Sequence, residues 1–344
     1  MARQRTRMAD IAEHAHVSMA TVSRVVNGTG PVSDQTRHRV LVAIDSLGYE
    51  RPVTPSASST PVIGVITPEL VNPIFAAYAH EIQTEISRSG AIPLICSQTP
   101  GGTSEDGYVQ LLLRQGASGL VFVSGRHADY LADTGRYAHL TDSAVPFVTI
   151  NGAREEIAAP DFSTGDGLGI RVAVHHLREL GHTRIALLGG QTHIVPARRK
   201  ADAFRDVMRD AFGEEHPIIV ETFYTYEAAA AATASLVERG VTAIVAGSDL
   251  QALGAIRTLR AMGRRVPEDL SVIGFDDSRL MDHLNPPLTT IRQPVQAITR
   301  AAVAALLQTV GGDDPHPGSF VYTPDLVVRG STGRAAPAPA PAVS

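Results

Sequence analysis

The stretch Val17–Gly28, VSMATVSRVVNG, decides how the N-terminal part of the chain folds. Ser18 is a residue type that caps helix N-termini, and Val22 and Val25 recur three residues apart, as the buried stripe of a helix does. The pair Asn27–Gly28 tolerates positive φ and commonly ends helices. The stretch therefore predicts a short amphipathic helix that begins just after Ser18.

Two further helices are expected around this one. Residues 8–15 carry apolar side chains at helical spacing, and a similar pattern follows the capping residue Ser33. The inward positions of these two helices are Ile11, Ala12, Ala15, Val40, Ile44 and Leu47. Two short helices joined by a tight turn and covered by a third make a helix-turn-helix, in which the second helix lies in the major groove of DNA.

The outward residues of the second helix are the candidates to contact DNA. Arg24 is best suited to a specific contact, because a guanidinium can donate two hydrogen bonds to one guanine. Residues 1–52 contain more arginines than acids, which favours a phosphate partner, although the whole chain has a net charge of −5. The alternative is a three-helix packing module that binds no nucleic acid. The DNA-binding candidates are Ser18, Met19, Ala20, Thr21, Ser23, Arg24 and Asn27.

The longer string MADIAEHAHVSMATVSRVVNGTGPVSDQTRHRVLVAIDSLGYERP, residues 8–52, resembles the DNA-binding head of the lactose/galactose repressor (LacI/GalR) family almost position by position. His16 departs from the family pattern, which usually has glycine in this turn. If the position has positive φ, histidine is one of the less disfavoured substitutes. The resemblance implies a sequence-specific repressor that binds an inverted-repeat operator in double-stranded DNA as a homodimer.

From Pro61 onward, short apolar runs alternate with helical patterns. The runs are PVIGVI, AIPLICS, GLVFVS and PFVTIN, followed by RIALLGG, PIIVETF, AIVAG and LSVIGF. This alternation predicts right-handed βαβ units and parallel sheets with both faces covered. Two groups of about four strands each predict two lobes, with a ligand cleft at the carboxyl ends of the strands. The expected fold is a helix-turn-helix head on an α/β two-lobed core like that of periplasmic binding proteins.

Polar and aromatic side chains fall in the loops that should border this cleft. A carboxylate, cationic and amide donors and an aromatic face suit a hydroxyl-rich small molecule such as a sugar. Taken singly, each residue also has a simpler explanation, since Asp276 can cap a turn and Tyr224 can belong to the core. The effector-binding candidates are Asn72, Phe75, Ser124, Arg198, Lys200, Tyr224, Ser248, Asp276 and Gln293.

Segments of the body, among them IGVITPELVNPIFA, HHLRELGHTRIALLGG and VPEDLSVIGFDDSRL, are similar to the effector-binding and dimerising core of the same family. By that resemblance Asp276 holds effector hydroxyls and Tyr224 stacks on the effector. The resemblance also implies that Ser124, Ser248 and Gln293 line the pocket. Lys200 stands where the family commonly has an arginine, and lysine lacks the planar two-pronged fork. Arg198, two residues earlier, is the alternative cationic partner.

The sequence lacks the motifs that are typical of several other classes of protein. The motifs GxxxxGK[ST], GxGxxG, GxSxG and HExxH are absent, so we expect no enzyme, no cofactor and no metal site. A solute-binding protein, or a sensor with a weakened DNA-binding head, would share the two-lobed body. A transported solute-binding protein needs a secretory signal, and MARQRTRMAD lacks the apolar middle of one. No apolar run is long enough to span a membrane, so we expect a cytoplasmic protein.

Four segments are expected along the chain. Residues 1–50 form the head, 51–61 a linker, 62–333 the two-lobed core and 334–344 a disordered tail. The linker RPVTPSASSTP contains three prolines and no leucine, so it predicts an atypical hinge in place of the family's DNA-bending hinge helix. The Pro/Ala-rich tail lacks leucine heptads and therefore predicts a dimer, not a tetramer.

Overall fold

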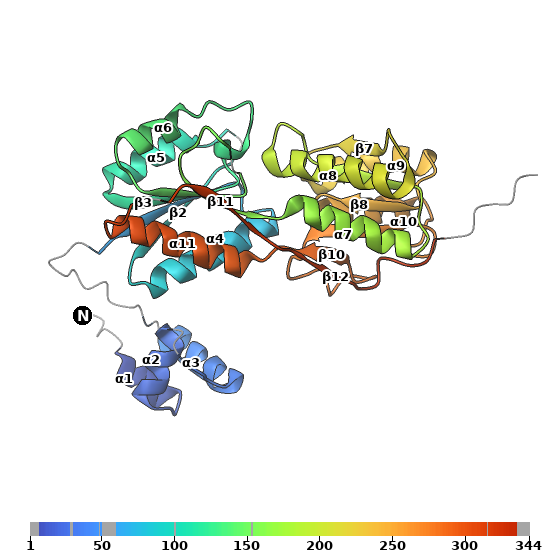
Figure 1. The fold of residues 1–344 in the computed structure, drawn as a ribbon. Helices are drawn as coiled ribbons and strands as arrows, with labels where there is room; N and C mark the ends of the chain where they lie inside the picture. The colour runs from blue at the N-terminus through green and yellow to red at the C-terminus, as the bar shows by residue number, and fades with distance from the viewer. Residues whose placement is uncertain are drawn as a thin grey trace, which may run out of the picture. The chain divides into compact units, whose positions relative to one another are not determined.

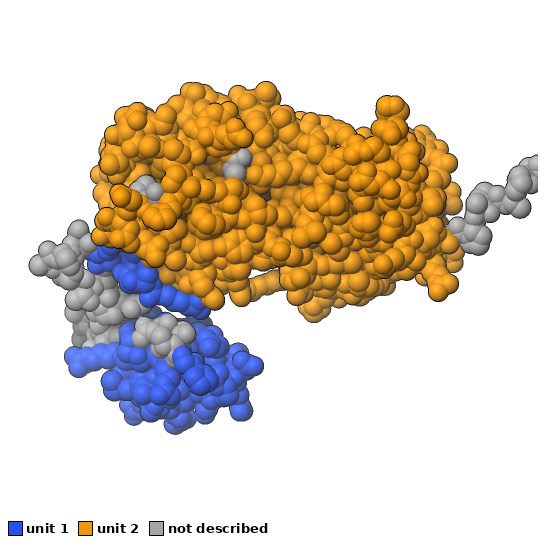
Figure 2. Space-filling view, viewed as in Figure 1, with its two compact units in different colours: residues 1–61, 87–92 blue, residues 62–86, 93–344 orange. Residues whose placement is uncertain are grey.

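A computed structural model gives the fold and describes residues 7–27, 30–47, 49, 60–99, 101–152, 154–314 and 316–335. The chain forms two compact units, residues 1–61 with 87–92 and residues 62–86 with 93–344 (Figure 2). The atypical hinge expected at 51–61 and the disordered tail expected at 334–344 lie almost wholly outside the described residues. Within the described ranges, no helix has the length and apolar character needed to cross a membrane.

The first unit contains three helices, α1 (Met8–His14), α2 (Met19–Asn27) and α3 (Asp34–Leu47) (Figure 1). Ser18 Oγ accepts a hydrogen bond from Thr21 N at 3.1 Å, and Ser33 Oγ accepts one from Thr36 N at 3.3 Å. Both predicted N-caps are therefore confirmed. The inward side chains form one small core of Ile11, Ala12, Ala15, Val22, Val25, Val40 and Ala43, against which Ile44 and Leu47 pack partly buried.

His16 lies in the turn between α1 and α2 and has a φ of 51°. The turn is closed by backbone hydrogen bonds from His16 N to Glu13 O at 3.2 Å and from Val17 N to Ala12 O at 3.0 Å. A side chain in this left-handed region crowds its own carbonyl, so histidine adopts it at some cost in strain. The position therefore does have positive φ, and the helix-turn-helix keeps its turn with histidine in place of glycine.

The second unit has two lobes, and each is built on one six-stranded sheet. The strands of the first lobe are β1 (Val62–Thr67), β2 (Ile92–Ser97), β3 (Ala117–Val123), β4 (Phe147–Ile150), β5 (Pro160–Thr164) and β11 (Gly318–Tyr322). Its helices are α4 (Pro73–Arg88), α5 (Glu105–Arg114), α6 (Gly135–Asp142), α11 (Val295–Val310) and the short 3-10 helix η1 (Arg126–Ala128). The strand order is β11-β5-β4-β3-β1-β2, and the pairs from β11 to β1 are parallel.

The second lobe repeats this arrangement. Its strands are β6 (Ile185–Gly189), β7 (Ile218–Glu221), β8 (Ala243–Ala246), β9 (Ser271–Asp276), β10 (Thr289–Arg292) and β12 (Asp325–Val327). Its helices are α7 (Asp166–Glu179), α8 (Val195–Phe212), α9 (Tyr226–Glu238) and α10 (Asp249–Ala261). The order is β12-β10-β9-β8-β6-β7. Among these described strands the β12–β10 pair is antiparallel, and the other four pairs are parallel.

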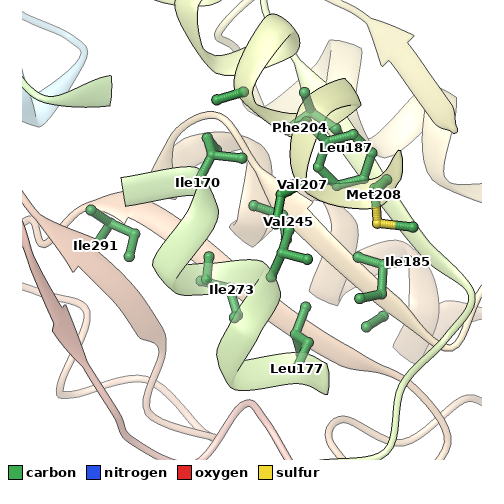
Figure 3. Packing of buried hydrophobic residues seen from close by; sticks show 14 of the residues in the cluster. Ile170, Leu177, Ile185, Leu187, Phe204, Val207, Met208, Val245, Ile273 and Ile291 are labelled. Carbon is green, nitrogen blue, oxygen red and sulfur yellow. The ribbon is translucent and has the colours of Figure 1, made fainter. Parts of the chain in front are cut away.

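Helices cover both faces of the second sheet, which explains why its strands read as continuous apolar runs. On one face Leu187 of β6 packs with Ile170 of α7 and Phe204 of α8 (Figure 3). On the other face the neighbouring residues of β6 pack with the side chains of α9 and α10. The carboxyl ends of the strands are therefore left as the place where polar side chains can gather.

The prediction of about four strands in each lobe was wrong, because the described residues contain six in each. β5, with the sequence PDFST, and β10, TTIR, are rich in Ser, Thr and Asp and carry no apolar run. Among the described residues, the chain crosses between the lobes three times, from β5 to α7, from β10 to α11 and from β11 to β12. The predicted two-lobed parallel α/β core is confirmed.

Candidate DNA-binding face and ligand cleft

Helix α2 divides its side chains between the core of the first unit and solvent. Val22 and Val25 are buried, whereas Met19, Ala20 and Arg24 are exposed. This division leaves the outward face of α2 available to enter a DNA groove, because its apolar face packs into the core.

Two of the predicted contact residues also serve the helix itself. Ser18 Oγ lies 2.9 Å from Thr21 Oγ1, so the two hydroxyls share a hydrogen bond at the start of α2. Arg24 lies beside Gly30, whose added Cβ would meet the arginine Cδ at 3.7 Å. Ser23 is half-buried, and the side chain of Asn27 lies outside the described structure.

The second unit brings Asp276 and Gln293 together at its centre. Gln293 Nε2 donates to Asp276 Oδ1 at 2.7 Å, while Gln293 Oε1 accepts from Tyr78 Oη at 3.0 Å and from Thr164 Oγ1 at 2.7 Å. Tyr78 and Thr164 belong to the first lobe and Asp276 to the second. Gln293 thus joins the two lobes through hydrogen bonds that end on one buried carboxylate.

Burial raises the pKa of Asp276 well above its ordinary value, and the neighbouring carboxyl of Asp249 raises it further. Asp249 accepts hydrogen bonds from Thr290 Oγ1 at 2.6 Å and from Ser278 N at 2.7 Å. Burial, offset in part by these two donors, raises the pKa of Asp249 to about 7. Two carboxyl groups of the second lobe therefore hold protons more tightly than exposed aspartates do.

Lys200 extends from α8 into the same region and is buried. Its Nζ lies 3.4 Å from Asp166 Oδ1, donates to Gly247 O at 3.2 Å and lies 3.8 Å from the ring centre of Phe275. Burial alone would lower the pKa of Lys200, but the acidic groups of Tyr224, Asp166 and Asp276 outweigh burial and raise it. The ammonium is therefore a fixed positive charge in the cleft.

Tyr224 is half-buried beside Lys200, whose Nζ lies 5.7 Å from the centre of its ring. A Cβ added at Gly190 would overlap its ring, so the tyrosine lies directly on the backbone of that glycine. Burial raises the pKa of Tyr224, and the backbone of Gly190 beside its oxygen lowers it in part. The buried hydroxyl makes no close, well-aligned hydrogen bond with a described residue, which costs free energy that a ligand hydroxyl could recover.

Left-handed backbone at residues other than glycine recurs at the carboxyl ends of the strands. Ser124 after β3 has φ 44°, Asn151 after β4 has φ 63°, and Asp276 at the end of β9 has φ 122°. Such strain persists where the surrounding structure fixes it, and it concentrates at binding sites. The three residues come from both lobes, which supports a site at the cleft.

Other predicted residues have structural roles. Ser248 caps α10 by accepting from Gln251 N at 3.2 Å, and Asn72 Oδ1 accepts from Ile74 N at 3.4 Å at the start of α4. Phe75 and Ser124 are half-buried, and neither side chain forms a hydrogen bond with another described residue. Arg198 does not join the buried set formed by Asp276, Gln293 and Lys200, because its guanidinium lies 4.0 Å from the ring centre of Tyr130.

The sequence reasoning missed several polar side chains of the cleft. They are Tyr78, Asn151, Thr164 and Asp166. Thr164 and Asp166 flank the first crossing between the lobes, and the one signal for them is the mostly polar run PDFSTGD, which is too polar to be predicted as a core strand. Among the described residues, no group of three His, Cys, Asp or Glu side chains could hold a metal ion.

Two parts of the chain match known protein families, and nearly the whole chain is similar to a known regulator. A family described as "Bacterial regulatory proteins, lacI family" matches residues 7–52, and one described as "Periplasmic binding protein-like domain" matches residues 174–332. The chain is 47% identical over 335 residues to the HTH-type transcriptional regulator MalR of Streptomyces coelicolor, covering 96% of this chain and 97% of that one.

Two solved structures resemble nearly the whole chain. The complex of the transcriptional regulator CelR with cellobiose has a TM-score of 0.69 and 30% identity, over 95% of this chain and 100% of that chain. The lac repressor dimer bound to operator and to the anti-inducer ONPF has a TM-score of 0.70 and 28% identity, over 96% of this chain and 100% of that chain.

Proposed function

Because the chain belongs to the lacI family of bacterial regulatory proteins, which are helix-turn-helix transcription regulators and not enzymes, we propose that it is a repressor controlled by a small sugar. In this proposal it binds an inverted-repeat operator as a homodimer in the cytoplasm. A sugar or sugar derivative in the cleft between the lobes changes its affinity for that operator.

The observation that carries the DNA-binding proposal is the divided surface of α2. Its apolar side is fully used by the core of the first unit, and Met19, Ala20 and Arg24 are exposed on the rest of the helix. Arg24 would recognise guanine, while Met19 and Ala20 would contact thymine methyl groups. Ser18, Thr21, Ser23 and Asn27 complete the proposed contact set.

A homodimer fits an operator of this type, since two-fold protein symmetry matches an inverted repeat. The similar lac repressor structure is a dimer bound to its operator. We infer that this chain assembles in the same way, with one head on each half-site.

The effector proposal rests on the buried polar set of the second unit. Asp276 would accept hydrogen bonds from ligand hydroxyls, the Tyr224 hydroxyl would gain a well-aligned partner, and Lys200 would donate from one side. Gln293, Ser248, Ser124, Asn72 and Phe75 are proposed to line the same cleft. The related CelR structure contains cellobiose, which supports a sugar as the class of effector.

The test is a selection of genomic DNA fragments by the purified full-length protein, followed by footprinting of the enriched site. We expect two symmetric protected half-sites. Arg24→Ala should weaken binding to that site by about 10- to 100-fold, because it removes a two-pronged contact with a base. Arg39→Ala is the matched control, since Arg39 is also an exposed arginine of the first unit but lies on α3.

The outcome separates specific from general binding. Equal losses for Arg24→Ala and Arg39→Ala would mean that only positive charge matters and that α2 does not recognise bases. No enriched fragment at low salt would contradict the operator proposal itself.

A further inference from the structure

The two lobes meet at a second place, which the proposed effector set does not include. Asp129, after the short helix η1 of the first lobe, forms an isolated antiparallel bridge with Ile194 of the second lobe. Tyr130 N donates to His193 O at 2.8 Å, and His193 Nε2 lies 4.0 Å from Asp129 Oδ1. These contacts join the loop after β3 to the loop after β6.

The side chain of Tyr130 is the centre of this contact. Arg198 of the second lobe lies over its ring, with its guanidinium carbon 4.0 Å from the ring centre, and Arg154 of the first lobe lies 5.6 Å from the same centre. Tyr130 nevertheless remains 40% exposed. An aromatic ring with arginines from both lobes around it is therefore open to solvent at the edge of the cleft.

The arginines are held in place by backbone oxygens. Arg198 Nε donates to Thr192 O at 2.9 Å, and Arg154 Nη1 donates to Asp129 O at 2.7 Å. Thr192 Oγ1 in turn donates to Glu221 Oε1 at 2.9 Å. Side chains with hydrogen-bonding groups therefore lie around the Tyr130 ring. An apolar face with polar groups at its edge suits a pyranose.

The start of helix α8 carries one residue of the Tyr130 contact and one residue of the buried set. Arg198 and Lys200 lie two residues apart near the start of α8, and their side chains diverge. Lys200 is buried against Phe275 and Asp166, whereas Arg198 is exposed and reaches Tyr130. Arg198 and Lys200 thus lie on two sides of the start of α8, and only a ligand long enough to pass this point would contact both.

We propose that Tyr130 and Arg198 form a second sugar subsite at the mouth of the cleft, which takes the outer ring of a disaccharide or longer saccharide. The inference rests on the proposed sugar effector. The outer ring lies against the face of Tyr130 that Arg198 now covers, and the displaced guanidinium donates to the ring hydroxyls. A monosaccharide reaches only the buried set and leaves the Tyr130–Arg198 contact intact.

The experiment is calorimetric titration of the full-length protein with glucose and with its dimers maltose and cellobiose. We expect at least one disaccharide to bind about tenfold tighter than glucose, because ring stacking adds to the buried contacts. Tyr130→Ala and Arg198→Ala should each weaken disaccharide binding by about tenfold and change glucose binding by less than about threefold. Tyr130→Phe keeps the ring and should keep the disaccharide preference.

The matched control is Arg205→Ala, on the same helix, where an exposed arginine forms an ion pair with Asp202 and with no other described residue. It should leave all three affinities unchanged. Equal losses for glucose and disaccharides in the Tyr130 and Arg198 variants would overturn the subsite, as would no loss at all. If the unmodified protein binds none of the three sugars, the proposed effector class fails and the subsite fails with it, while operator selection remains a separate test of the head.

Discussion

Asp249 shows how one buried side chain can make stability depend on pH. Its folded pKa is about 7, raised from an ordinary 3.8 by burial. Between these values the folded protein holds a proton that the unfolded chain has released. The stabilisation is therefore fully present below about pH 4 and is lost as the pH rises through 7, because ionising the buried carboxyl disfavours folding.

We predict that Asp249→Asn removes this dependence. Relative to the variant, the unmodified protein should lose unfolding free energy between pH 5 and pH 8, by up to about 3 kcal/mol at about 1.4 kcal/mol per pH unit. Urea unfolding at several pH values measures the difference, in which the contributions of titratable groups far from Asp249 cancel. Asp269→Asn is the control, because the pKa of half-buried Asp269 is about 2 and lies outside this range. Parallel curves for the protein and Asp249→Asn would contradict the prediction.

At the same scale, the sequence could predict those site residues whose chemistry is visible without the fold. Asp276, Tyr224 and Gln293 were predicted from their places after apolar runs and from family resemblance, and the structure brings Asp276 and Gln293 into contact. Tyr78 could not be predicted, because its spacing on α4 reads as an ordinary core position. Its role follows from a contact with Gln293, 215 residues away in sequence.

At the scale of elements, the head was predictable and part of the body was not. Capping serines and apolar stripes are local signals, so α1 to α3 could be located from the sequence alone. β5 was missed because its buried polar residues satisfy one another, as when Ser163 Oγ and Thr149 Oγ1 both donate to Asp161. That compensation depends on neighbouring strands and leaves no periodic signal.

The turn of the helix-turn-helix provides a prediction at this scale. His16 has φ 51°, where a β-branched residue is more strained than histidine and glycine is least strained. His16→Val should destabilise the first unit by about 1–2 kcal/mol, whereas His16→Gly should be neutral or slightly stabilising. Hydrogen exchange of the α1 and α2 amides measures this local stability. Equal protection in both variants would show that the turn carries no strain.

At the scale of the whole molecule, one contact between the lobes is a candidate to couple effector binding to the operator affinity of the head. Gln293 links Tyr78 and Thr164 of the first lobe to Asp276 of the second. We infer that an effector whose hydroxyls bind Asp276 displaces Gln293 from Asp276 Oδ1. Effector binding would then break a connection between the lobes, and a ligand shifts an equilibrium only through such a difference.

We predict that Gln293→Ala partly imitates the effector. It should move the operator affinity of the ligand-free protein in the direction in which the effector moves it, by about fivefold or more, which is the lower end of typical coupling between sites. The response of the variant to added effector should shrink in proportion. Gln296→Ala, which changes an exposed glutamine three residues later in helix α11, should leave both quantities unchanged. Operator titrations with and without sugar measure the two affinities, and a shift opposite to that of the effector would mean that the Gln293 bridge opposes the change that the ligand drives.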